Sequence, residues 1–203
     1  MAYPNLSQEK KLWRRGYRVV TGLDEVGRGC LAGPVVAAAV SILNTRYKIQ
    51  NTKVRDSKKL TPRQREKFYK MLVDSQWLEW GIGAVSEKVI DRINILEATK
   101  LAMGKAVKSL VKKFRRKSSA HNFHDRVNSV LMDFLILDGN FTLPAGALAK
   151  AGIDFNIPQK SIVKGDEKVF SCAAASILAK VTRDRIMIRY HKKYPRYRFD
   201  LHK

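Results

Sequence analysis

Apolar residues follow two different periods along the chain, and this change of period predicts a mixture of strands and helices. Residues 17–27 (YRVVTGLDEVG) and 33–43 (GPVVAAAVSIL) are rich in β-branched and small apolar residues, and a glycine-rich turn separates them. Such a pair is typical of two antiparallel strands. A third strand is predicted at residues 77–85, WLEWGIGAV. Between these strands, Thr61 and Pro62 suit the N-cap and first position of a helix.

The second half of the chain changes to helical spacing. From residue 86 to about 111, apolar residues recur every three or four positions, which predicts one short and one long helix. Residues 112–129 are polar and basic without an apolar face, and they predict an exposed basic loop. Residues 130–140 (VLMDFLILDGN) form a continuous apolar run, as expected of a central strand buried on both faces.

The end of the chain completes the predicted architecture. Residues 160–166 (KSIVKGD) predict a short strand, and residues 167–194 predict a long helix whose alanine-rich face suits close packing on a sheet. Strands followed by alternating helices and strands indicate an α/β fold, which we expect to contain a central mixed five-stranded sheet flanked by helices. A length of 203 residues fits one domain, 1–203, preceded within it by an N-terminal extension over about residues 1–16.

The net charge of the chain indicates which class of partner it binds, but it does not indicate an activity. The chain has 40 Lys and Arg against 18 Asp and Glu, a formal net charge of +22. The basic residues are spread along the whole chain and interleaved with Tyr and Trp, which favours nucleic acid as the partner. The alternative is a ribosome-associated protein or one whose cations form a solvated face.

The same composition argues against a membrane or secreted protein. No stretch approaches the roughly 18 apolar residues of a membrane span, so we expect no membrane partner. Only Cys30 and Cys172 occur, without disulfide or zinc-ligand spacing, and the N-terminus lacks an apolar signal core. These features predict a cytoplasmic location.

Acidic residues stand at the ends of apolar strands or beside glycine in three places. They are Asp24 and Glu25 in LDEVGRG, Asp138 in LILDGN and Asp166 in VKGDEK. Buried carboxylates that converge repel one another and are costly unless a cation neutralises them. A hard divalent ion such as Mg²⁺ accepts several carboxylate oxygens and leaves positions for water and phosphate. In a protein of charge +22, this pattern favours a metal-dependent nuclease over turn-forming aspartates.

Three local features leave alternatives open. Asp24 and Glu25 are neighbours on a strand and should point to opposite faces, so either the strand bends or one residue acts partly through its backbone. Gly27, Arg28 and Gly29 form either a close-approach loop for a ribose or phosphate, or a tight hairpin turn. Ser57 and Lys58 in DSKKL either meet phosphates or flank a helix.

The ordered blocks of the chain resemble ribonuclease HII. GLDEVGRGCLAGPVVAAAV, DSKKL, IDRINILEATKLAM, LILDGN, SIVKGD and AAASILAKVTRDR are similar to that family's blocks, in its order, from about residue 19 to 185. The resemblance implies an RNase H-like fold and a metal-dependent endonuclease using Mg²⁺ or Mn²⁺. Its implied substrates are the RNA strand of RNA–DNA hybrids and duplex DNA with embedded ribonucleotides, incised on the 5′ side to leave a 3′-hydroxyl and a 5′-phosphate.

The resemblance also implies roles for individual residues. The metal-binding carboxylates would be Asp24, Glu25, Asp138 and Asp166. The loop that contacts the ribose 2′-hydroxyl would be Gly27, Arg28 and Gly29. Further nucleic-acid contacts would be Ser57, Lys58 and Asn94. Asp184 lies in a family block without belonging to the ligand set, and we interpret it as structural.

Departures from the family pattern define the competing hypothesis. Cys30 stands where the family has proline, the basic segment 112–129 is longer than usual, and the family's Gly-Tyr element and C-terminal helical portion have no counterpart in the sequence. We therefore expect ribose recognition to depend on the glycine loop. The alternative is a catalytically weak nucleic-acid-binding module, and we expect a monomer in either case.

Overall fold

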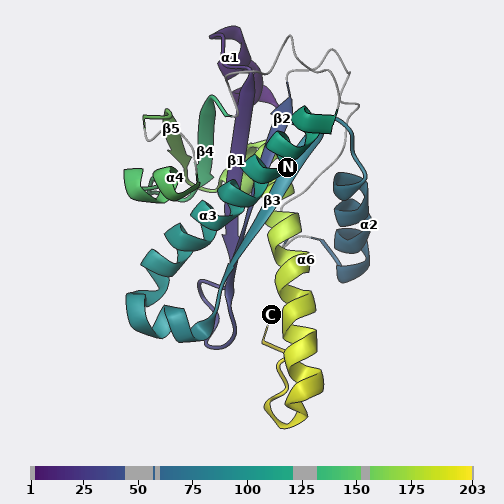
Figure 1. Cartoon of the computed structure of the whole chain (residues 1–203). Helices are drawn as coiled ribbons and strands as arrows, with labels where there is room; N and C mark the ends of the chain where they lie inside the picture. Colours follow the sequence, from purple (N-terminus) through teal and green to yellow (C-terminus); the bar gives the residue numbers. More distant parts are fainter. Residues whose placement is uncertain (1–2, 44–56, 58–59, 121–131, 152–155, 203) are drawn as a thin grey trace.

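A computed structural model of the chain (Figure 1) describes residues 3–43, 57, 60–120, 132–151 and 156–202. The strands are β1 (Val19–Val26), β2 (Val35–Leu43), β3 (Leu78–Val85), β4 (Phe134–Asp138) and β5 (Gln159–Ile162). The helices are α1 (Ser7–Arg14), α2 (Pro62–Val73), α3 (Glu87–Ala120), α4 (Ala145–Ala151), α5 (Gly165–Lys168), α6 (Phe170–Lys193) and the 3₁₀ helix η2 (Pro195–Tyr197).

The strands form one mixed five-stranded sheet in the order β3-β2-β1-β4-β5. β1 pairs antiparallel with β2, and β2 pairs antiparallel with β3, which confirms the predicted hairpin. β4 runs parallel to β1, and β5 runs parallel to β4. The predicted α/β fold with a mixed sheet flanked by helices is therefore confirmed.

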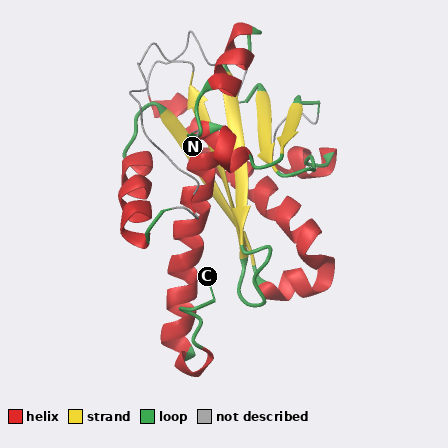
Figure 2. Cartoon of the chain, turned by 180° about the vertical axis from the view of Figure 1, so that it is seen from behind, coloured by secondary structure: helices red, strands yellow, loops and turns green. Residues whose placement is uncertain are grey.

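Helices cover both faces of the sheet. α3 and α4 pack on one face around Leu23 and Ala39, whereas α6 and α2 pack on the other around Ala38 and Val40. Figure 1 shows α3 crossing one face, and Figure 2, turned by 180°, shows α6 from the opposite side. The small side chains of β2 let helices approach from both sides, because successive residues of a strand point to opposite faces.

Close packing of α3 on β3 depends on two glycines. A Cβ at Gly83 would lie 2.1 Å from the carbonyl oxygen of Ala102, and a Cβ at Gly81 would lie 2.3 Å from that of Ala106. Any larger residue would force the helix away from the sheet. The two glycines in WLEWGIGAV thus permit α3 to pack closely on this strand.

α3 confirms one prediction and corrects another. It consists of two helices joined at Asn94, whose φ of 65° and ψ of 168° are not helical, as the short and long helix predicted. The loop predicted over residues 112–129 is wrong for 112–120, because α3 continues to Ala120. Buried Phe114 follows Leu110 and Val111 at helical spacing and extends the apolar face by a turn. Residues 121–129 lie outside the described residues.

The predicted start of α2 is confirmed in detail. The side chain of Thr61 accepts a hydrogen bond from the backbone N–H of Gln64, while the Gln64 side chain accepts one from the backbone N–H of Thr61. This reciprocal cap, followed by Pro62, fixes where the helix begins.

The predicted N-terminal extension contains α1, which packs against the strands. Leu12 is buried with Val20 and Phe134, and the buried Glu9 carboxylate accepts the backbone N–H of Ser171 at the start of α6. Burial raises the pKa of Glu9, although this hydrogen bond opposes the shift. Within the described part of the chain, no helix combines the length and apolar character that crossing a bilayer requires.

Candidate active site

Three carboxylates meet where β1 and β4 end. The carboxyl ends of parallel strands lie at the same edge of a sheet, so Asp24 near the end of β1 and Asp138 at the end of β4 become neighbours. Asp166, in α5, joins them from the segment that follows β5. One carboxylate oxygen of each residue lies within 4.8 Å of the other two. The site is thus assembled from three separate segments, and Asp24 is more than 100 positions from the other two residues.

Local backbone geometry brings α5 against Asp138. Lys164, with φ of 56°, adopts the left-handed conformation and turns the chain after β5. The backbone N–H of Gly165 then donates a hydrogen bond of 2.7 Å to Oδ1 of Asp138. A Cβ on Gly165 would lie 3.3 Å from Cα of Asp138, so glycine permits the close approach.

The electrostatics of the cluster favour a bound cation. Burial raises the pKa of Asp24 well above its ordinary value, and the nearby charges of Asp138, Glu25 and Asp166 add to the rise. A hydrogen bond from Ser176 opposes it. Burial and the charge of Asp24 also raise the pKa of the Cys172 thiol well above its usual range. Several carboxylates that are hard to ionise together match the expectation for a divalent metal site with oxygen ligands.

Glu25 takes a different position from the other predicted ligands. β1 keeps regular pairing through Asp24 and Glu25 opposite Ala38 and Ala37, so the strand does not bend there. Glu25 therefore points to the face opposite Asp24, and its carboxylate lies 3.7 Å from the guanidinium of Arg28. The backbone N–H of Glu25 donates a 2.7 Å hydrogen bond to Oδ1 of Asp24. In this structure Glu25 thus contacts Asp24 through its backbone.

The glycine loop, which we define as Gly27–Pro34, follows directly after β1. Gly27 has a φ of 102°, and its carbonyl accepts the N–H of Cys30 at 3.3 Å, which makes the GRG triplet a turn. The Arg28 guanidinium lies 5.7 Å from the ring centroid of Phe141, while its side chain stays 41% exposed. No atom lies within 4 Å of a Cβ built on Gly29, so the turn leaves open space at that glycine.

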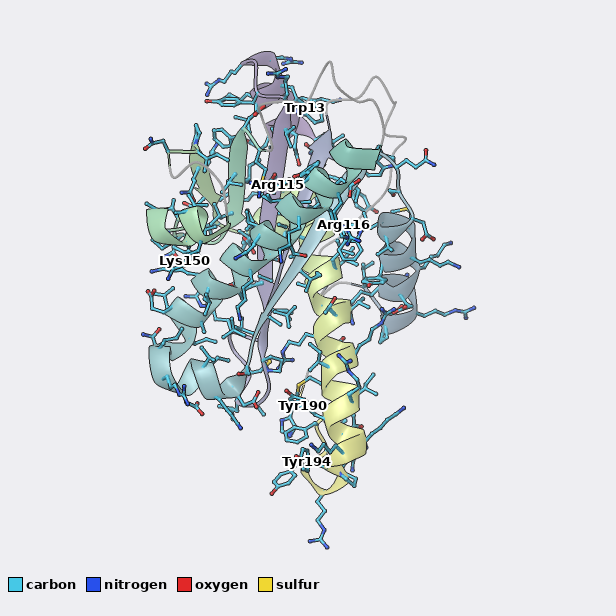
Figure 3. All side chains as sticks on the ribbon, viewed as in Figure 1. Trp13, Arg115, Arg116, Lys150, Tyr190 and Tyr194 are labelled. Carbon is cyan, nitrogen blue, oxygen red and sulfur yellow. The ribbon has the colours of Figure 1, made fainter. Side chains whose placement is uncertain are left out.

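A hollow of about 530 Å³ adjoins the glycine loop. It lies between Leu31, the first turn of α3 at Glu87, and the end of α6 at Tyr190 and Tyr194. Figure 3 shows these two tyrosines around the C-terminal end of α6, at the bottom of the view, whereas Arg115 and Arg116 lie on α3 in the upper half. The two tyrosines thus line a hollow beside the glycine loop. A larger hollow, of about 760 Å³, lies between α2 and Arg185 and is lined by none of the clustered carboxylates.

Of the remaining predicted nucleic-acid contacts, one is buried, one caps a helix and one lies outside the described residues. Ser57 is buried, and its hydroxyl lies 2.8 Å from that of Ser176. The side chain of Asn94 accepts the backbone N–H groups of Leu96 and Glu97, and so caps the second helix of α3. Lys58 lies outside the described residues. The role of each in nucleic-acid binding remains a prediction.

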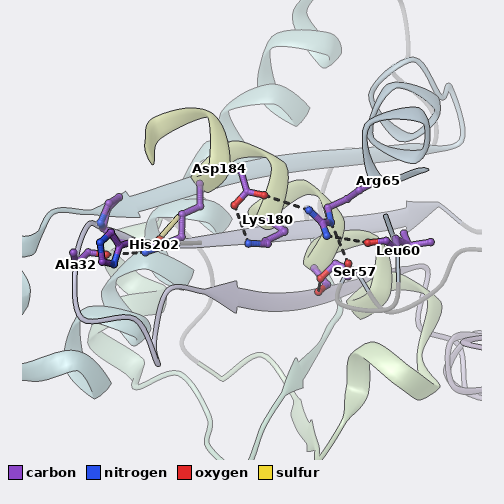
Figure 4. A network of polar contacts seen from close by, with 10 residues as sticks. Ala32, Ser57, Leu60, Arg65, Lys180, Asp184 and His202 are labelled. Atoms are coloured by element: carbon purple, nitrogen blue, oxygen red, sulfur yellow. Dashed lines mark hydrogen bonds and ion pairs between the residues drawn. The ribbon is translucent and has the colours of Figure 1, made fainter. Parts of the chain in front are cut away.

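Two residues of α6 were not predicted as part of the site. Ser176 connects Asp24 to Ser57 by hydrogen bonds, and Arg183 contacts the glycine loop. A signal existed for Arg183, since it continues the i, i+4 row of buried Ala175 and Ala179. A charged residue on a buried helix face marks a special contact. Figure 4 shows the network around these residues, from Ser57 and Arg65 at one end to Ala32 and His202 at the other.

Comparison with known proteins agrees with this geometry. The family model of ribonuclease HII matches residues 21–203. A ribonuclease HII from Acetivibrio thermocellus is 47% identical over 195 residues, which cover 96% of this chain and 64% of that protein. The chain thus spans about two thirds of the length of this relative.

Solved structures give the same fold. The ribonuclease H2 of Pyrococcus horikoshii has a TM-score of 0.62 at 30% identity, with 87% of this chain and 77% of that chain covered. The Bst ribonuclease HIII solved in complex with Mn²⁺ has a TM-score of 0.63 at 18% identity, with 87% and 55% covered. Fold and site together define the class, a ribonuclease with an RNase H-like fold. Within that class, the chain belongs to the ribonuclease HII family.

Proposed function

We propose that the protein is a metal-dependent endonuclease that cleaves the RNA strand of RNA–DNA hybrids and incises duplex DNA on the 5′ side of embedded ribonucleotides. The observation that carries this proposal is the cluster of Asp24, Asp138 and Asp166, whose carboxylate oxygens lie within 4.8 Å of one another. Family membership supports the same substrate class. The physiological role that follows is the removal of misinserted ribonucleotides.

The residues present fit a divalent ion, Mg²⁺ or Mn²⁺. Asp24, Asp138 and Asp166 would hold it. Glu25, the fourth predicted ligand, would have to reach the ion around the end of β1, from the face opposite Asp24. When bound, such ions activate a water molecule and stabilise the leaving oxygen of a phosphodiester. The Mn²⁺ complex of the Bst ribonuclease HIII supports this choice of ion.

The protein's own groups would supply orientation and recognition. Gly27, Arg28 and Gly29 would approach the ribose, because the turn leaves Gly29 open and keeps Arg28 partly exposed. The Gly165 N–H and the Ser176 hydroxyl hold the carboxylates of Asp138 and Asp24 in place. Ser57, Lys58 and Asn94 would complete the contacts to the nucleic-acid backbone. The net charge of +22 would attract the duplex and make binding strongly salt-dependent.

An incision assay tests the proposal. A duplex with one ribonucleotide and an all-RNA strand in a hybrid are incubated with the chain and Mg²⁺ or Mn²⁺, and we expect cleavage of both, with 5′-phosphate ends. Absence of any metal-dependent incision at several protein concentrations would sink the proposal. Salt-sensitive binding occurs under both hypotheses, so such binding without turnover would instead support the nucleic-acid-binding module.

Two further properties belong to the same proposal. The two cysteines are both free, which fits the predicted cytoplasmic setting. We expect a monomer, and sedimentation or light scattering of the chain at assay concentration measures this directly.

A further inference from the structure

A buried arginine connects α6 to the glycine loop. The Arg183 side chain is fully buried, and its guanidinium donates three hydrogen bonds to backbone carbonyl oxygens. Nε donates to Pro34 at 3.0 Å, Nη2 to Ala32 at 2.8 Å, and Nη1 to His202 at 3.1 Å. One side chain thus holds the C-terminal end of the glycine loop and the turn after η2 against the same helix.

The loop is shaped to admit this guanidinium. A Cβ at Gly27 would lie 2.7 Å from Nε of Arg183, so glycine at this position leaves room for the guanidinium. A Cβ at Gly33 would instead meet Sδ of Met187, at 2.4 Å. Burying a guanidinium is costly unless its donors are paired, so the three carbonyl groups and Gly27 are conditions for its presence. Loss of the side chain would leave buried carbonyl oxygens without their donors.

The next residue holds the second predicted contact segment. Oδ2 of Asp184 lies 3.3 Å from Nη1 of Arg65, and Oδ1 lies 2.8 Å from Nζ of Lys180. Arg65 in turn donates to the carbonyl oxygens of Ser57 and Leu60, each at 3.0 Å. Figure 4 shows Asp184 between Lys180 and Arg65, with Ser57 and Leu60 beyond.

Helix geometry explains why neighbours serve two different segments. Successive residues of an α-helix point about 100° apart, so Arg183 and Asp184 face different sides of α6. The same helix carries Ser176, which contacts Asp24. α6 is therefore one rigid element that contacts the glycine loop, the carboxylate cluster and, through Arg65, Ser57.

We propose that Arg183 and Asp184 are positioning residues that fix the glycine loop and the pair Ser57 and Leu60, respectively, relative to the catalytic carboxylates. This rests on the proposed function for its effect on cleavage. Arg183 acts on ribose recognition through the loop, whereas Asp184 acts on general backbone binding through Arg65. Neither side chain contacts the reacting atoms.

Amide hydrogen exchange tests the positioning independently of activity. Arg183→Met should speed exchange at Cys30 and His202 at least about 10-fold while leaving Thr61 and Arg65 unchanged. Asp184→Asn should do the reverse. Such separation is expected because the two contacts involve different segments, and local openings are measured segment by segment.

Matched controls remove the effect of charge. Arg185→Met removes the same charge from the adjacent position, where the arginine forms an exposed ion pair with Glu66. Asp74→Asn matches the charge change of Asp184→Asn at an exposed site. Both controls should leave the four reporter amides unchanged.

Cleavage kinetics test the functional half. Arg183→Met should raise KM for the single-ribonucleotide duplex about 10- to 100-fold, with a much smaller change for the all-RNA hybrid and an unchanged pH profile. Asp184→Asn should raise KM for both substrates by similar factors. Arg183→Lys should give an intermediate KM, because one ammonium group replaces only part of the three-carbonyl contact.

Each result decides a separate claim. Equal exchange in Arg183→Met and Arg185→Met would overturn the positioning role, whether or not the chain cleaves. If the wild type cleaves and Arg183→Met keeps the wild-type ratio of the KM values for the two substrates, the link to ribose recognition is overturned. Absence of cleavage by the wild type would overturn only the proposed function. If Arg183→Met does not fold, amide exchange is measured in Arg183→Lys and in the wild type instead. Exchange at Cys30 in both proteins as fast as in an unstructured peptide would refute the proposal.

Discussion

The two faces of the sheet differ in where they place charge. On the α3 face, the cations Lys105, Lys108 and Lys112 lie on the exposed side of the helix, and the contact with the sheet is made by alanines and larger aliphatic residues. On the α6 face, charged groups are buried. Among the described residues, four charged side chains are at most 4% exposed, and each belongs to α5 or α6 or contacts them: Glu9, Asp24, Asp166 and Arg183. On the α3 face, the one buried charged residue among those described is Glu79, which is 8% exposed near the start of β3.

One face of the sheet therefore serves mainly stability, and the other face serves mainly function. Buried charge is costly, so a face that carries it gives up stability unless a ligand or a hydrogen-bond network compensates. The α3 face, by contrast, contributes packing. The comparison predicts that substitutions on the α6 face change activity and metal response, whereas substitutions where α3 packs on the sheet change stability alone.

The largest effect is expected at Asp138. Asp138→Asn should lower cleavage at least about 10³-fold, on the order of 4 kcal/mol in the barrier, because it removes a predicted metal ligand. Hybrid binding should persist. Parallel cleavage and binding titrations measure both, with the exposed Asp74→Asn as the control of equal charge. Unchanged turnover in Asp138→Asn would remove this residue from the site.

The second effect concerns metal and pH. Because the folded-state pKa of Asp24 is raised, its ionisation opposes folding, and metal-free stability should fall as pH rises through that pKa. Asp24→Asn should flatten this dependence, while Glu9, whose pKa is also raised, contributes equally to both proteins.

Mg²⁺ should reverse the loss of stability at neutral pH. Saturation at 100 times its Kd would raise the free energy of unfolding by about 2.7 kcal/mol. Thermal melts with chelator or Mg²⁺, from pH 5 to 8, provide the measurement for wild type and Asp24→Asn. An identical Mg²⁺ response in both proteins would contradict the assignment of Asp24.

The third effect tests the α3 face. Gly83→Ala should destabilise the protein by about 1–3 kcal/mol, because the new Cβ meets the backbone of α3. Gly146→Ala is the matched control, since nothing lies within 4 Å of its Cβ. Urea unfolding with and without Mg²⁺ should show the same Mg²⁺ increment in Gly83→Ala as in the wild type. A reduced increment would mean that the two faces are coupled.

The smallest effect is expected at Lys113, on α3. Its ammonium lies 3.2 Å from the ring centroid of Trp80, and Lys113→Gln should cost about 0.5–1 kcal/mol. Cleavage and KM should stay unchanged. A raised KM would show instead that the basic segment around Lys113 contacts nucleic acid.

Periodicity predicted the elements well where local rules dominate. The hairpin of β1 and β2, the capped start of α2 and the two-part α3 were all accessible from spacing, turn residues and capping residues. The end of α3 was missed, because the buried contact of Phe114 outweighed a local composition that favours a loop. The location of the acidic cluster was accessible from carboxylates at strand ends, and the family blocks reinforced it.

The sequence by itself determined the strand and helix pattern, the basic character and the set of acidic residues, because these depend on neighbours within a few positions. Only the tertiary structure decided that β1 stays regular through Asp24 and Glu25 instead of bending, that Ser57 is buried against Ser176, and that Arg183 holds the glycine loop. These contacts join residues up to about 150 positions apart. They depend on strand order and helix packing, which no local pattern in the sequence specifies.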